Sequence, residues 1–103
     1  MHFPKREKIL FKVLENSRVD ILKYLIEKQN YTPNIKNKYG ETLLFAAANN
    51  ICFNKEDFII LKYLLDKCGL KQEDLLSLML NFKDKPEVIK LFVEKFTKQQ
   101  NFM

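Results

Sequence analysis

The chain has 103 residues, a net charge of +5 and hydrophobic residues at 47% of its positions, a balance typical of one folded domain. Two glycines and three prolines are too few for the many tight turns of an all-β fold, so we expect helices. No apolar run approaches the ~20 residues that cross a bilayer, and the N-terminus lacks the apolar core of a signal peptide. Because Cys52 and Cys68 are the only cysteines, we expect free thiols and an intracellular protein, cytoplasmic or nuclear.

The first third of the chain is predicted to form two helices. Apolar residues recur at helical spacing over residues 9–16 and again over residues 21–28, with a polar turn at 16–18 between them. Residues 29–41 follow without a helical period and contain turn-forming Pro33 and Gly40. This segment ends at Thr42, which we predict to cap the N-terminus of the next helix.

The same pair of helices is predicted twice more along the chain. A first helix begins at Leu43 and a second spans residues 60–67, with an insertion at 51–57 between them. The third pair opens with the polar residues 72–74, and its second helix begins near Pro86, where the first turn of a helix tolerates proline.

These pairs are copies of one another. Residues 9–16 and residues 43–50 share the pattern apolar-Leu-Phe-x-apolar-apolar-polar-Asn, 34 positions apart. Residues 21–28 match residues 60–67 almost throughout, and residues 88–95 are a third copy. An internal repeat of this length indicates a stack of similar units. We therefore divide a single domain, residues 1–103, into units at about 1–33, 34–70 and 71–103.

Residues 34–47 resemble an ankyrin repeat, a family with a period of about 33 residues and a T-P-L-H-x-A core. The residues that carry the resemblance fall on the family's turn and first helix: Gly40, Thr42, Leu44 and Ala47. The resemblance implies an all-α, ankyrin-like stack of about three helix-turn-helix units. The outer units would act as caps with more polar outer faces.

Two departures from the family pattern change what we expect. Phe45 stands where the family has histidine, and Phe11 repeats this change in the first unit, so we expect aromatic packing there. Leu43 replaces the family's proline. The link at residues 68–74 is too short for a full hairpin, so we expect one hairpin finger near residues 36–41 and a plain turn at the second junction.

The resemblance implies a protein that binds another protein through its finger and the concave face of its first helices. Carried over residue by residue, it points to Lys36, Asn37, Lys38, Tyr39 and Glu41 on the finger and to Ala46, Asn49 and Asn50 on the helix. Tyr39 is interpreted either as an interface anchor or as a cover for the hairpin. Phe53, in the insertion, either plugs the groove above the helix at 43–49 or anchors a partner.

No pattern for catalysis or for metal binding is found in the sequence. His2 is the only histidine and the glycines are isolated, so no His-based triad, metal site or phosphate loop can be assembled. The paired carboxylates at 56–57 and 73–74 each open a predicted helix, where acidic groups complement the helix dipole. We therefore expect a non-enzymatic protein without a metal or cofactor.

Two other functions are compatible with the sequence. A small basic helical protein binds nucleic acid when its lysines converge, and Lys23, Lys62 and Lys90 recur at one position of the repeat. Alternatively, an imperfect cap leaves an apolar end that associates with another copy, although a monomer is the first expectation. The pattern also fits one piece of a longer repeat array.

Overall fold

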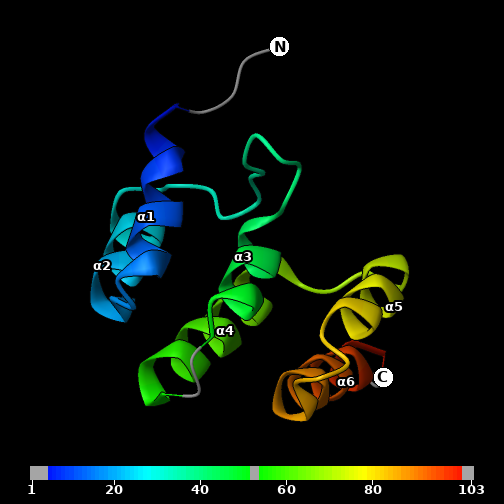
Figure 1. The fold of residues 1–103 in the computed structure, drawn as a ribbon. Helices are drawn as coiled ribbons and strands as arrows, with labels where there is room; N and C mark the ends of the chain where they lie inside the picture. The colour runs from blue at the N-terminus through cyan, green and yellow to red at the C-terminus, as the bar shows by residue number, and fades with distance from the viewer. Residues whose placement is uncertain (1–4, 52–53, 101–103) are drawn as a thin grey trace.

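Apolar residues at helical spacing fold into helices along the whole described chain (Figure 1). The computed structural model describes residues 5–51 and 54–100. The described chain is all-helical, as predicted, and contains no extended strand. Its elements in order are the 3-10 helix η1 (Lys5–Lys8), α1 (Ile9–Glu15), α2 (Val19–Lys23), the π-helical turn η2 (Tyr24–Lys28), α3 (Leu43–Asn49), α4 (Lys55–Cys68), α5 (Gln72–Asn81) and α6 (Pro86–Gln100).

The helices pack as three consecutive pairs. α1 contacts α2, α3 contacts α4 and α5 contacts α6, and the pairs lie side by side in Figure 1. Between pairs, α1 contacts α3, α2 contacts α4, and α4 contacts α6. The core runs through all three pairs, and its largest fully buried side chains are Leu10, Leu22, Leu43, Leu61, Leu64, Val88 and Phe92.

Helix starts follow the capping signals in the sequence. The Thr42 hydroxyl accepts a hydrogen bond from the Phe45 N–H at 3.0 Å, which confirms the predicted cap of α3. Asn54 caps α4 in the same way, through a 2.8 Å bond from the Asp57 N–H. The paired carboxylates lie in the first turns of α4 and α5, and α6 begins at Pro86, as predicted.

The two links between the pairs differ in length, and this difference positions the site. Residues 29–42 join the first pair to the second and rise above α3 (Figure 1). Within them, a tight turn is closed by an isolated antiparallel bridge between Lys36 and Thr42, where the hairpin was predicted. We call residues 36–42 the finger. Residues 69–71 alone join α4 to α5, so nothing comparable stands above the third pair.

The expectation of polar outer faces on the end units is wrong. Ile9, Ile21 and Tyr24 are exposed in the first pair. Leu76, Leu80 and Val93 are exposed in the third pair. The outer pairs keep the apolar positions of the repeat although they have a neighbour on one side only.

The expected aromatic contact of Phe45 is confirmed, because its ring lies 5.3 Å from that of Phe82 at the end of α5. Ile51 is buried after α3, whereas Cys52 and Phe53 lie outside the described residues, so neither reading of Phe53 is tested. In the described ranges no helix is both long enough and apolar enough to cross a bilayer.

Candidate functional site

The finger takes its shape from hydrogen bonds that converge on Asn37. The Asn37 Oδ1 accepts from the N–H groups of Tyr39 at 2.9 Å and Glu41 at 3.0 Å, and its Nδ2 donates to Glu41 Oε1 at 3.0 Å. Gly40 completes the turn with φ of 81°, a conformation that glycine adopts without strain, as predicted. These bonds hold Tyr39 at the tip, where 76% of its surface is exposed.

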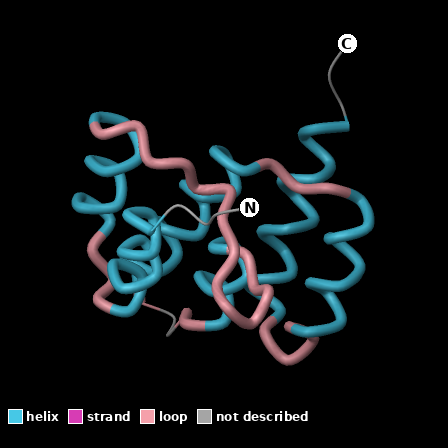
Figure 2. The backbone as a smooth tube through the Cα atoms, turned by 90° about the horizontal axis from the view of Figure 1, so that it is seen from above, coloured by secondary structure: helices cyan, strands magenta, loops and turns pink. Residues whose placement is uncertain are grey.

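A groove of about 580 Å³ lies on one side of the finger, bounded by α1 and α3. Eight of the nine residues predicted from the sequence line it, and the ninth, Phe53, lies outside the described residues. The lining consists of Lys8, Phe11, Glu15, Lys36, Asn37, Lys38, Tyr39, Glu41, Ala46, Asn49 and Asn50. Figure 2 shows the loop that carries the finger running across the helices. We call this hollow the finger groove.

The α1 wall of the finger groove was missed by the sequence prediction. Lys8, Phe11 and Glu15 recur at helical spacing, so they share one face of η1 and α1. A signal was present, because Glu15 occupies the same repeat position as Asn49, which was predicted.

The finger groove combines an aromatic rim, a small apolar floor and charges of both signs. Lys38 Nζ lies 5.3 Å from the centroid of the Tyr39 ring, within the range of a cation–π contact. Half-buried Phe11 and Ala46 supply the apolar surface. The charged groups are Lys8, Lys36, Lys38, Glu15 and Glu41, so three positive groups are interspersed with two negative ones. Such a lining suits a protein surface better than a phosphate backbone, which requires clustered positive charge.

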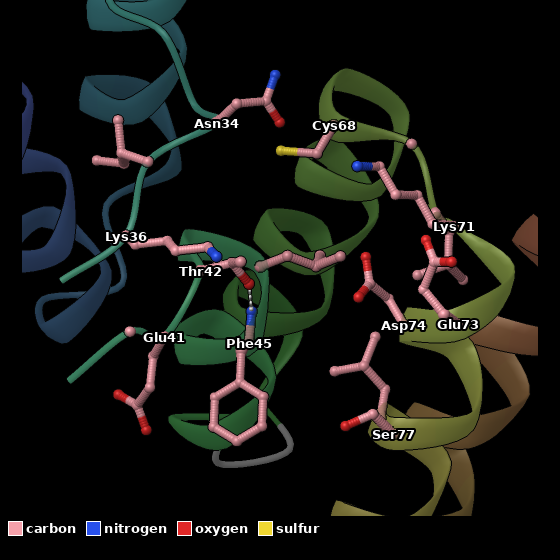
Figure 3. A pocket seen from close by; sticks show the side chains of 16 residues that line it. Asn34, Lys36, Glu41, Thr42, Phe45, Cys68, Lys71, Glu73, Asp74 and Ser77 are labelled. Carbon is pink, nitrogen blue, oxygen red and sulfur yellow. Dashed lines mark hydrogen bonds between the residues drawn. The ribbon is translucent and has the colours of Figure 1, made fainter.

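A second hollow of about 530 Å³ lies on the opposite side of the finger, facing α5 (Figure 3). It exists because the three-residue link before α5 leaves that side of the finger uncovered. Figure 3 shows Cys68, Glu73 and Asp74 on its far wall. The Cys68 Sγ lies 3.8 Å from the Pro33 carbonyl oxygen, and burial raises the pKa of this thiol to about 11, so the nucleophilic thiolate is scarce at neutral pH.

The described residues hold no group of three or more His, Cys, Asp or Glu side chains that could bind a metal ion. The recurring Lys23, Lys62 and Lys90 are exposed on the second helices of the pairs and do not line the finger groove. Lys23 instead lies over the Tyr63 ring, with Nζ 5.5 Å from the centroid.

Comparison with known proteins assigns no family to the chain. No protein-family model, no curated protein and no solved structure matches it significantly. The finger groove is therefore interpreted from the chain's own residues.

Proposed function

We propose that this chain is a non-catalytic module that binds another protein in the finger groove, and that its helical pairs form an ankyrin-like stack. The observation that carries the proposal is convergence. Eight residues that the sequence resemblance indicated, on the finger and on the adjoining α3 with its C-cap, line one hollow. A hollow of this size accommodates a few side chains of a partner surface rather than a whole domain.

Rigidity of the walls supports binding. α1 and α3 contact each other within the core, and the finger is held by the hydrogen bonds of Asn37. A preorganised surface loses little conformational entropy when a partner docks, so more of the contact energy appears as affinity.

Tyr39 is the proposed anchor. It combines high exposure with a position at the rim, and a tyrosine buries a large area while losing only two rotatable bonds. The lysines and glutamates around it would set orientation and specificity, because rim charges chiefly govern the choice of partner.

Affinity capture from nuclease-treated lysate tests the proposal, with wild type, Tyr39→Ala and Lys62→Ala compared. Lys62 is the control, because it is exposed on α4 and does not line the finger groove. The proposal expects a defined protein that wild type and Lys62→Ala retain and Tyr39→Ala loses, followed by direct binding of that purified protein.

Two results would contradict the proposal. Equal capture by Tyr39→Ala and wild type would remove the finger groove as the binding site. Capture that disappears after nuclease or at modest salt would indicate nucleic-acid binding instead.

A further inference from the structure

The two ends of the stack expose apolar side chains at positions that are buried elsewhere in the same molecule. The second helices of the pairs carry the matching segments 21–28, 60–67 and 88–95. Ile21 is 37% exposed, whereas its equivalents Ile60 and Val88, which have a preceding pair, are 3% and 0% exposed. This position is therefore covered whenever another pair precedes it.

The opposite end shows the complementary pattern. Val93 is 40% exposed, whereas its equivalents Ile26 and Leu65, which have a following pair, are 9% and 2% exposed. Within the described residues, no pair precedes that of Ile21 and none follows that of Val93. Ile21 and Val93 therefore occupy the two sides of the contact that neighbouring pairs make with each other within the chain.

The first helices agree with this pattern at the first end of the stack. Counting back from the ends of α1 and α3, at Glu15 and Asn49, makes Ile9 equivalent to Leu43. Ile9 is 48% exposed, whereas Leu43 is fully buried. In the third pair, the core side chains of α5 and its C-cap are Leu78 and Phe82, and this packing leaves Leu76 and Leu80 64% and 66% exposed.

An ion pair recurs at the same two repeat positions. Glu27 of the first pair lies 4.0 Å from Lys67 of the second, and Asp66 of the second lies 2.9 Å from Lys95 of the third. At the acidic position of this ion pair the third pair carries Glu94, and at the lysine position the first pair carries Lys28. Both are exposed at opposite ends of the stack, and no salt bridge joins either to another described residue.

We propose that the outer face of the third pair binds the outer face of the first pair of a second copy, head to tail. The apolar halves are Leu76, Leu80 and Val93 on one side and Ile9, Ile21 and Tyr24 on the other. Glu94 of one copy pairs with Lys28 of the next, which continues the ion-pair series and fixes the register. The occupant is a second copy because the two faces are the two halves of a contact that this chain already makes twice.

Such an interface is heterologous, so each copy keeps one free face and assembly continues beyond two copies. The finger groove does not contain any of these residues. Self-association is thus independent of the proposed partner binding, and either can fail without the other.

The experiment is sedimentation velocity of purified full chain over a wide concentration range, with Ile21→Lys, Leu80→Lys and the control Ser77→Lys. Ser77 is exposed on α5 but lines the hollow beside the finger rather than the outer face. Wild type and Ser77→Lys are expected to rise in average mass past two copies as concentration increases. Each end variant alone is expected to remain monomeric, since a buried lysine weakens association by about tenfold or more.

Mixing the two end variants decides the orientation. Ile21→Lys keeps an intact third-pair face and Leu80→Lys keeps an intact first-pair face, so the mixture is expected to form dimers and nothing larger. A monomeric mixture, a variant that dimerises alone, or a wild type that stays monomeric or stops at two copies would each overturn the proposal.

The register has its own test. Glu94→Lys and Lys28→Glu are each expected to weaken association by about fivefold, because like charges then face each other. The double variant is expected to recover wild-type association. Failure to recover would overturn the proposed register. Circular dichroism of every variant checks that its helices are intact.

Discussion

Replacing Asn37 with alanine removes the side chain that organises the finger. Three hydrogen bonds of 2.9–3.0 Å are lost, to the N–H groups of Tyr39 and Glu41 and to the Glu41 carboxylate. A hydrogen bond contributes about 1 kcal/mol net, and these three share one half-buried side chain, so we expect a loss of about 1–3 kcal/mol from the finger.

Hydrogen exchange of the finger amides and urea denaturation measure this loss together. The matched control is Asn34→Ala, in the same link, because the Asn34 side chain is exposed and none of the described hydrogen bonds involves it. Asn34→Ala is expected to change the free energy of unfolding by less than about 0.5 kcal/mol. Equal effects of the two substitutions, or unchanged protection at Tyr39 and Glu41 in Asn37→Ala, would refute the role assigned to Asn37.

Three further predictions concern the cap, the core and the thiol. Thr42→Ala removes the bond to the Phe45 N–H, so urea denaturation should show a loss of about 1 kcal/mol, and an unchanged midpoint would contradict the cap. Leu61→Ala leaves a cavity at a fully buried site, so the free energy of unfolding should fall by about 2–5 kcal/mol in the same assay. Substitution of the exposed Lys62 by alanine should be nearly neutral, and similar values for both variants would contradict the core assignment. In a Cys52→Ser background, the alkylation rate of Cys68 should keep rising up to pH about 11, because only the thiolate reacts; a plateau near pH 9 would contradict its burial.

The helices and their caps could be predicted because local signals specify them. The period of apolar residues predicts residues 21–28 as helical, and these residues lie in α2 and η2. The change to π-helical bonding was not predicted, since it depends on the bond from the Gln29 N–H to the Tyr24 carbonyl, and no residue type marks it. The 3-10 turn at Lys5–Lys8 was also missed, because it precedes the first apolar residue of the period.

The candidate site was predictable only where the resemblance supplied residues. Lys8 and Phe11 were missed because packing between two pairs, rather than any local pattern, decides which helix face borders the finger. The role of Asn37 inside the finger was missed for a related reason, since its hydrogen bonds depend on the turn geometry. The prediction of polar outer faces was wrong because it followed the polar caps of the family. The outer pairs of this chain instead expose Ile21 and Leu80.

Crosslinking from within the finger groove shows whether a protein binds there. A photoreactive amino acid is placed at Tyr39, and at exposed Lys62 as the control, and each protein is irradiated in nuclease-treated lysate. One discrete protein adduct is expected from position 39, and the same adduct is expected to be absent from position 62. The same adducts from both positions, or no protein adduct from position 39, would contradict it.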